Sequence, residues 1–448
     1  MKSYFLRRFL LILPTLLGIT FLVFAITRFV PGGPMDRMLQ QAAGTAEGGG
    51  AKKASSDAGG GLSEEQVEEL EEQFGLDKAM PVAYLQWLGL LPKEVRLSKG
   101  EFGVMGDGMI GGGGEDPDNT ASLVLRGDGR LLEVKKKGDT IVSVKCRQDN
   151  ADITAEGWKV RYESVKMRKE RFSKRSVDGA QVPTYLPRAV AYRTNFSGLL
   201  QGDLGRSTVY NDPVGQMILE RVPVAAYFGL LTAIITYAVC LPLGILKALK
   251  HRTFIDSASS VLIFIGYSIP GFALGAILLV HFGARMNLFP LFGMTSPGFA
   301  EMALWEQVKD LAHHTVLPLL CYLVGSFAML TMMTKNNLMD QLSADYVRTA
   351  VAKGVGFRKA VFNHAFRNSM IPIATSLGGL VGIFIGGSLL VETVFDIQGF
   401  GLLQYQAVIA RDVPVIMGTL TIAAFLMLLG NVISDMIVAM VDPRIKFK

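Results

Sequence analysis

Few residues of this chain have the types and spacing that catalysis, proton transfer or metal binding requires. Two carboxylates, Glu392 and Asp435, lie within strongly apolar stretches, where an ionisable side chain is costly and is therefore a candidate for function. Glu392 either contacts a transported solute or makes a structural hydrogen bond, and we expect Asp435 to pair with a neighbouring helix. The adjacent His313 and His314 could bind a metal or relay a proton, but we favour interfacial residues at the start of a helix.

The chain lacks the motifs of a nucleotide-driven or hydrolytic enzyme. No Gly-x-x-x-x-Gly-Lys-Ser/Thr sequence occurs, so the chain cannot bind ATP as P-loop proteins do. Cys240 and Cys321 lie in apolar stretches and Cys146 lies in a polar one, so we expect neither a disulfide nor a zinc site. The sequence therefore predicts no catalytic residue, no metal and no cofactor bound by this chain.

Apolar blocks dominate the rest of the sequence. Half of the 448 residues are hydrophobic, and a membrane-spanning helix needs about 20 consecutive apolar residues. The blocks of that length are residues 9–30, 224–249, 256–283, 313–334, 372–394 and 414–441. They predict an all-α polytopic membrane protein with six transmembrane helices, in which the first block is a retained span rather than a cleaved signal peptide.

Basic residues beside these blocks set the predicted orientation. Arg7 and Arg8 precede the first block, the 247–255 and 335–371 loops are basic, and so is the C-terminal DPRIKFK. Since Lys and Arg gather in short cytoplasmic loops, both termini should lie inside and residues 31–223 outside, in the periplasm. The net charge of +6 arises from these loops and the outer segment, so it does not indicate nucleic-acid binding.

The outer segment divides into pieces between an N-terminal span (1–30) and a five-helix core (224–448). Residues 31–91 hold a Gly/Ala/Ser linker and then LSEEQVEELEEQFG, whose capping-box pattern at Ser63 and Gln66 predicts a short amphipathic helix on the membrane surface or on the protein.

Residues 92–193 have the character of a β-rich insert. Apolar and polar residues alternate around the turn sequences GDG and KGD, which predicts three to five antiparallel strands. The basic residues of the insert are either a solvated surface or a contact for a binding protein, lipid headgroups or murein. Residues 194–223 should return to a loop.

The 335–371 loop is long, basic and broken by Gly354 and Gly356. Apolar residues recur before the glycines at helical spacing, and they are Leu338, Leu342, Tyr346 and Ala350. This spacing predicts a helix up to Lys353, a stop at Gly354, a bend at Gly356 and a second helix over 357–370, with Pro372 opening the fifth span. The loop is either a pair of interfacial helices or a docking elbow for a cytoplasmic partner, in which glycine permits close approach.

The loop sequence DYVRTAVAKGVGFRKAVFNHAFRNSMIPI resembles the cytoplasmic signature loop of binding-protein-dependent ABC importer permeases, and most of all that of the dipeptide/oligopeptide permease family. FLRRFLLILPTLLGITFLVFAITRFVPGGP, GLLQGDLGRS, IGYSIPGF and ETVFDIQGFG also resemble this family, so the resemblance covers nearly the whole chain except 92–193. IGYSIPGF and LPLGILKAL favour the branch associated with microcin C and murein-peptide uptake. The loop departs from the general importer signature, which begins with Glu-Ala-Ala, by carrying Arg348-Thr349-Ala350.

The resemblance implies a transport subunit of the bacterial inner membrane that forms the pathway for peptides or peptide-like solutes. It implies as partners two cytoplasmic ATPase subunits that hold ATP and Mg²⁺, a second homologous permease subunit, a periplasmic substrate-binding protein and membrane lipid. The implied ATPase-coupling residues are Thr349, Ala350, Ala352, Lys353, Gly354, Val355 and Gly356, with Arg358, His364 and Arg367 in support. The candidates for the translocation pathway are Glu392, Gly382 and Gly386, although small residues such as these glycines also allow close helix packing.

Two other classes of membrane protein remain open. An ion-driven secondary transporter would show several intramembrane carboxylates and inverted repeats. A membrane-embedded enzyme with an outer regulatory domain would need a paired nucleophile and base, or metal ligands, at matching depths. Neither pattern is clear in the sequence.

Overall fold

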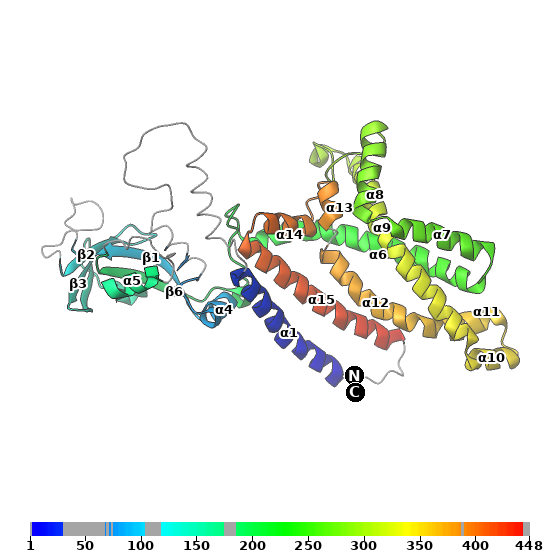
Figure 1. Ribbon diagram of the computed structural model, residues 1–448, viewed down its shortest axis with the longest axis horizontal. Helices are drawn as coiled ribbons and strands as arrows, with labels where there is room; N and C mark the ends of the chain where they lie inside the picture. Colours follow the sequence, from blue (N-terminus) through cyan, green and yellow to red (C-terminus); the bar gives the residue numbers. More distant parts are fainter. Residues whose placement is uncertain are drawn as a thin grey trace. The chain divides into compact units, whose positions relative to one another are not determined.

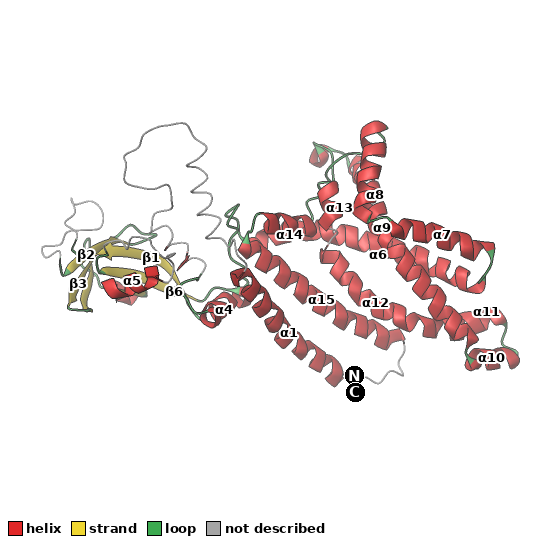
Figure 2. Cartoon of the chain, in the orientation of Figure 1, coloured by secondary structure: helices red, strands yellow, loops and turns green. Residues whose placement is uncertain are grey.

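The computed structural model describes residues 2–29, 68, 71–72, 75–103, 118–173, 185–386 and 389–441. The chain forms two compact units, of which one combines Met1–Arg37 with Leu204–Lys448 and the other is Met38–Asp203. In the described residues the first unit is helical, and the second holds the strands (Figures 1 and 2).

The first, helical unit is built on helices that pack against one another. They are α1 (Lys2–Phe29), α6 (Val214–Leu249), α7 (Phe254–Ser268), α8 (Gly271–Leu278), α9 (Leu304–Ser343), α12 (Arg367–Gly386), α14 (Phe400–Ile409) and α15 (Val413–Val441). Helix α15 lies between α1 and α12, and α12 also contacts α6 and α9 (Figure 1). The shorter elements are the π-helices η3 (Leu279–Arg285) and η5 (Val361–Phe366) and the helices α10 (Asp345–Ala352), α11 (Phe357–Ala360) and α13 (Leu389–Val394).

Four helices in the described part of the chain are long and apolar enough to cross a membrane: α1, α6, α9 and α15. A fifth candidate is the pair formed by α7 and the segment Gly271–Arg285, which is bent by 88°. Pro270 lies at this bend, where its fixed φ and missing N–H interrupt the helix. The predicted block 372–394 spans α12 and α13, whose junction at 387–388 lies outside the described residues. The described residues therefore show a mostly helical membrane protein with four or five candidate spans, where the sequence predicts six.

The helices extend beyond the apolar blocks that predict them. Helix α9 begins at Leu304, so the prediction that His313 and His314 start a helix is wrong. The carboxylate of Glu306 accepts a hydrogen bond from the backbone N–H of Ala303 at 3.2 Å, which satisfies an end group of the helix. The first turns of this helix therefore contain polar residues, and a hydropathy pattern does not detect that part of the helix.

Helices α6 and α9 approach each other closely at Gly244. A Cβ atom added there would lie 2.6 Å from Cβ of Thr334 and 3.0 Å from the carbonyl oxygen of Thr331. Both neighbours belong to the rigid frame of α9, so they cannot rotate away from a new methyl group. Gly244 is therefore a packing glycine of the kind that lets two membrane helices touch.

We expect Gly244→Ala to destabilise the helical unit by about 1–3 kcal/mol, the usual cost of forcing an extra methyl group into a packed interface. The measurement is thermal unfolding of the purified chain in detergent. Gly325→Ala on α9 is the matched control, since an added Cβ there meets nothing within 4 Å, and alanine favours a helix over glycine. Equal stability of the two variants would contradict the close approach of α6 and α9.

The second, β-rich unit contains two antiparallel sheets of three strands. One sheet has the order β1 (Lys93–Glu101), β6 (Arg188–Asn195), β5 (Trp158–Glu163), and the other β2 (Thr120–Val124), β3 (Leu131–Lys137), β4 (Thr140–Cys146). Their shared core includes Phe102, Leu132, Val134 and Trp158, and the helices α4 (Met80–Leu88) and α5 (Val165–Ser173) belong to the same unit.

The sequence located the β3–β4 hairpin correctly but underestimated the sheets. The predicted KGD turn lies between β3 and β4, with Gly138 at φ +64°. Six strands occur among the described residues instead of three to five. Strands β1 and β6 were missed because they pair across about a hundred residues, with Lys93 opposite Asn195, and no local turn signals such a pair.

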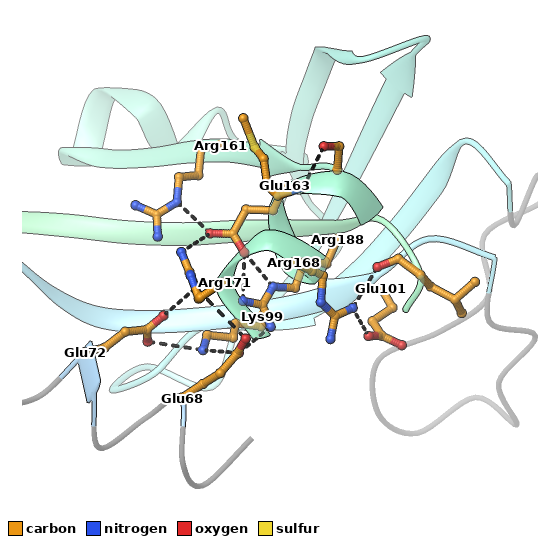
Figure 3. A network of polar contacts seen from close by, with 12 residues as sticks. Glu68, Glu72, Lys99, Glu101, Arg161, Glu163, Arg168, Arg171 and Arg188 are labelled. Carbon is orange, nitrogen blue, oxygen red and sulfur yellow. Dashed lines mark hydrogen bonds and ion pairs between the residues drawn. The ribbon is translucent and has the colours of Figure 1, made fainter. Parts of the chain in front are cut away.

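Acidic residues before α4 contact a buried network of charges on the β-rich unit (Figure 3). Glu68 accepts hydrogen bonds from Arg188 at 2.6 Å and from Lys99 at 3.2 Å, and Glu163 accepts from Arg188 at 2.7 Å. Glu72 pairs with Lys99 at 3.1 Å. The described residues of the predicted amphipathic helix thus lie on the protein, whereas its capping residues Ser63 and Gln66 lie outside the described residues.

The ion pairs of Glu68 should make this contact sensitive to acid. Burial raises the pKa of Glu68, but the hydrogen bonds and positive charges of Arg188 and Lys99 outweigh burial and lower it from 4.5 to about 2. A depressed pKa in the folded protein contributes stability above the unfolded value, and this contribution is lost as pH falls from about 4.5 towards 2.

We therefore expect the backbone amides of residues 68 and 71–72 to exchange hydrogen more slowly in the wild type than in Glu68→Gln at about pH 6. This difference should shrink as the pH falls towards 3, because the Glu68 carboxyl then binds a proton in the detached segment, where its pKa returns to about 4.5, and detachment becomes easier. Hydrogen exchange measured at each pH on both proteins cancels the intrinsic pH dependence of exchange. Equal exchange rates at about pH 6 would show that the ion pairs do not hold the segment.

Candidate functional site

The 335–371 loop of the helical unit contains a short helix, a left-handed turn and a second helical segment. Helix α10 ends before Lys353, and Gly354 takes φ +89°. The N–H of Gly354 donates to the carbonyl oxygen of Val351 at 2.9 Å, and that of Val355 donates to Ala350 at 3.1 Å. Since only glycine adopts this φ without strain, the predicted stop at Gly354 is confirmed.

Two details of the predicted loop are wrong. Residues 338–353 are not one helix, because α9 ends at Ser343 and Ala344 is extended, with ψ 145°. The chain does leave its helical path at Gly356 before α11, although its φ of −55° is open to any residue. Pro372 lies inside α12 rather than opening a new helix, since proline is tolerated in membrane helices whose backbone groups find other partners.

One face of α10 is buried against its neighbours. Val347 packs in a cluster with Leu338 of α9, Ala248 of α6 and Ala360 of α11. The hydroxyl of Tyr346 donates to Oε1 of Gln341 at 2.6 Å, which ties α10 to the end of α9. The short helix is therefore fixed to the helical unit on this side.

The opposite face of the turn is open. We define the elbow surface as Thr349, Val351, Ala352, Lys353, Gly354 and Phe357, all of which are exposed. Phe357 is 61% exposed and Val351 is 40% exposed. Apolar side chains that stay exposed in this way are typical of a surface that binds another protein or a membrane.

The structure places the predicted coupling residues on and around this elbow. Thr349, Ala352, Lys353 and Gly354 belong to the elbow surface, and Gly356 is exposed beside it. Ala350 and Val355 are half-buried beneath it. The predicted supporting residues are exposed on the following segment, and they are Arg358 on α11, His364 on η5 and Arg367 at the start of α12.

The buried carboxylate of Glu392 lies on α13 and is 1% exposed. Its Oε2 accepts the backbone N–H of Leu402 at 2.7 Å, and its Oε1 accepts the hydroxyl of Tyr322 at 3.3 Å. The carboxylate thus caps the first turn of α14, where a negative charge is stabilised by the helix dipole. Of the two alternatives for Glu392, the structure shows the structural hydrogen bond, and contact with a solute stays a prediction.

The other residues that the sequence marked in the spans have simple positions. Asp435 on α15 forms an ion pair with Arg8 on α1, which confirms the expected partner on a neighbouring helix. Gly382 and Gly386 lie on α12, the helix that contacts α6, α9 and α15. Nε2–H of His313 donates a hydrogen bond to the carbonyl oxygen of Leu288 at 2.6 Å. The described residues contain no cluster suited to a metal ion.

The part of the chain that contains the elbow matches a known protein family. Residues 240–447, which include it, match the family described as "Binding-protein-dependent transport system inner membrane component". The chain is 39% identical over 249 residues to the peptidoglycan transport system permease protein YejB of Agrobacterium fabrum, which covers 55% of this chain and 68% of the relative. It is 35% identical over 262 residues to the oligopeptide transport system permease protein AppB of Bacillus subtilis, with 58% and 81% covered. The chain belongs to this family.

As a family member, the permease is an inner-membrane, multi-pass component of a binding-protein-dependent transport system. This confirms the resemblance drawn from the loop sequence. The permease is the transport component of such a system rather than its enzyme, which agrees with the prediction that it performs no chemistry and binds no cofactor.

Sequence reasoning missed two features of the permease near the elbow. The exposure of Val351 and Phe357 could not be read from their apolar character, which more often indicates burial. The buried ion pair between Asp256 and Lys335 was also missed, although a carboxylate at the first position of one apolar block and a lysine just after another were visible signals.

Proposed function

We propose that this permease forms the translocation pathway of an ATP-driven importer for peptides or peptide-like solutes. The observation that carries the proposal is the elbow surface, which is exposed on one side while Val347 fixes the other side to the helical unit. The names of its relatives, which transport oligopeptides and peptidoglycan components, support the class of solute. Similarity to the YejB proteins favours the murein-peptide and microcin C branch.

The proposed assembly has two cytoplasmic ATPase subunits, a second homologous permease subunit and a periplasmic substrate-binding protein. The ATPase subunits hold ATP and Mg²⁺ and contact the elbow surface. Nucleotide drives transport only if the ATPase dimer binds different elbow positions in its ATP-bound and nucleotide-free states, because a ligand shifts a conformational equilibrium only through differential affinity.

The proposed topology has six spans with both termini in the cytoplasm and residues 31–223 in the periplasm. The basic 247–255 and 335–371 loops support this orientation. In this arrangement 1–30 is the first span, 92–193 is the periplasmic insert, and 224–448 is the core. Gly382 and Gly386 belong to the part of the core proposed to line the pathway, and whether the Glu392 carboxylate also contacts the solute is a separate prediction that peptide preference tests.

The test is a gentle detergent purification of the full chain from its native membrane, followed by mass spectrometry of the proteins that accompany it. Phe357→Glu places a charge on the elbow surface, and Val142→Glu is the matched control at an exposed apolar residue of the β-rich unit. We expect a P-loop ATPase and a second permease with the wild type and the control, and loss of the ATPase alone from Phe357→Glu. If the wild-type chain purifies alone or only with itself, the proposed assembly with ATPase subunits and a second permease is wrong.

A further inference from the structure

A buried group of charges joins three helices of the permease next to the elbow. Asp256 lies in the first turn of α7 and is buried. Both of its carboxylate oxygens accept hydrogen bonds from Nζ of Lys335 on α9, each at 2.8 Å. Nζ of Lys247, in the last turn of α6, lies 3.1 Å from Oδ1 of the same carboxylate. One aspartate therefore contacts lysines from two other helices.

Lys247 holds the C-terminal end of α6 against the first turns of α7. Its side chain is 0% exposed, and its ammonium group donates to the carbonyl oxygen of Asp256 at 2.7 Å, to Oγ of Ser259 at 2.8 Å and to Oγ of Ser260 at 2.7 Å. An ammonium group has three protons to donate, so α7 supplies acceptors for all of them. The turn between the two helices is thereby held against α7.

The carboxylate also holds the α6–α7 turn itself. Oδ2 of Asp256 accepts the backbone N–H of Arg252 at 3.2 Å, and Nδ1 of His251 lies 3.3 Å from the same oxygen. Arg252 has φ +62°. A residue other than glycine is strained in this left-handed conformation and keeps it only when the surrounding contacts hold it there. Since Lys335 is the partner from α9, the pair Asp256–Lys335 is an ionic link between this fixed turn and α9, in addition to the packing of α6 on α9 at Gly244.

Stability alone is a weak reason for this arrangement. Removing two ammonium groups and a carboxylate from water is costly, and apolar side chains of similar size often pack at least as stably. The ion pair instead determines the register of the two helices, because it fixes which turn of α9 is held against α7.

The link lies close to the elbow along α9. Lys335 precedes the end of α9 at Ser343 by about 12 Å along the helix axis, at 1.5 Å per residue. Leu338, less than one turn after Lys335, packs in the same cluster as Val347 of α10 and Ala248, the residue after Lys247. The elbow is therefore packed against the segment of α9 that carries Lys335.

On the other side of the ion pair, α7 is connected through α8 to the helix that carries Glu392. Helix α7 continues into the 88° bend and α8. Helix α8 packs on α13, and Gly275 of α8 is the contact, since an added Cβ would lie 3.5 Å from Cγ1 of Val394 and 3.0 Å from the ring of Phe395. Glu392 belongs to the same short helix α13.

We propose that Asp256 and Lys335 are positioning residues that pass movement of the elbow surface from α9 to α7 and α8. This inference rests on the proposed function, because it takes the elbow as the place where ATP-driven movement enters. The pair touches neither nucleotide nor solute. It converts a shift of α9 into a shift of the bent α7–α8 pair.

The experiment measures ATP hydrolysis by the purified complex in lipid, with and without the substrate-binding protein loaded with peptide. We compare the wild type, Lys335→Met, which preserves chain length and removes the charge, and Lys335→Arg, which keeps the charge. Lys335→Met should retain bound ATPase and basal hydrolysis, while stimulation by the loaded binding protein and peptide uptake fall about tenfold, within the usual range of coupling between sites. Lys335→Arg should restore most of the stimulation.

Two results would overturn the assignment. Wild-type stimulation and uptake in Lys335→Met would show that the ion pair transmits nothing. Loss of the ATPase and of thermal stability in both variants would show a purely structural role. Failure of the proposed function is distinguishable, because the wild-type chain would then bring no ATPase into the complex at all.

Discussion

Replacing Gly354 with valine is expected to reduce peptide uptake by roughly tenfold or more, because the substitution strains the turn that shapes the elbow surface. Gly354 has φ +89°, and a β-branched residue is a strong outlier at positive φ. Strain of this kind costs on the order of 1–3 kcal/mol, which the loop can relieve by moving Lys353 and Phe357 out of position. Uptake of labelled peptide, normalised to the amount of permease in the membrane, measures the effect.

Gly356→Val is the matched control for this substitution. Gly356 has φ −55°, and an added Cβ meets nothing within 4 Å, so the turn accepts valine there. We expect uptake within about twofold of the wild type, as for an unstrained surface substitution. If both variants lose uptake equally, close approach of a partner to both glycines decides function, and the left-handed turn at Gly354 is not the cause.

The contrast between these two glycines shows how far sequence reasoning reached in the elbow. Both were expected to bend the chain, because glycine marks turns in general. Only Gly354 has the positive φ that requires glycine. The general position of the loop followed from its charges and flanking apolar blocks, whereas the dihedral angle of each residue depends on which carbonyl its neighbours' N–H groups reach.

Local patterns predicted the elements whose signals lie within a few residues. The stop at Gly354 and the Gly138 hairpin are of this kind. The features that were missed join distant residues: Lys335 bonds Asp256 across 79 positions, and Glu68 bonds Arg188 across 120. Periodicity and turn chemistry describe neighbours along the chain, so they carry no information about such partners.

The candidate site shows the same division between local and distant contacts. The family signature led directly to Thr349–Gly356, but it could not tell that Phe357 is exposed or that Val347 is buried against α9. Burial of a residue on a short helix depends on which neighbouring helices cover it. Glu392 was recognised as an unusual carboxylate, yet its acceptor role became evident only with Leu402 and Tyr322 in place.

Replacing Glu392 with alanine is expected to destabilise the permease and to lower uptake of every peptide in the same proportion. The substitution leaves the N–H of Leu402 and the hydroxyl of Tyr322 without this acceptor, and an unsatisfied buried polar group costs about 1–3 kcal/mol. Glu392→Gln retains an acceptor oxygen of similar reach, so it should lose less stability. Thermal unfolding in detergent and uptake of acidic, neutral and basic peptides are the paired measurements.

If Glu392 instead contacts the solute, a different result is expected, and this difference separates a structural role of the carboxylate from a role in the pathway. A carboxylate that touches the solute would favour cationic peptides, so Glu392→Gln would change the preference among peptides while thermal stability stayed near that of the wild type. Glu220→Gln, at an exposed carboxylate of α6, controls for the loss of one negative charge. Because Glu392 is 1% exposed and caps α14, we expect the loss of stability and an unchanged preference. A changed preference at full stability would place the carboxylate on the pathway and would require α13 to move during transport.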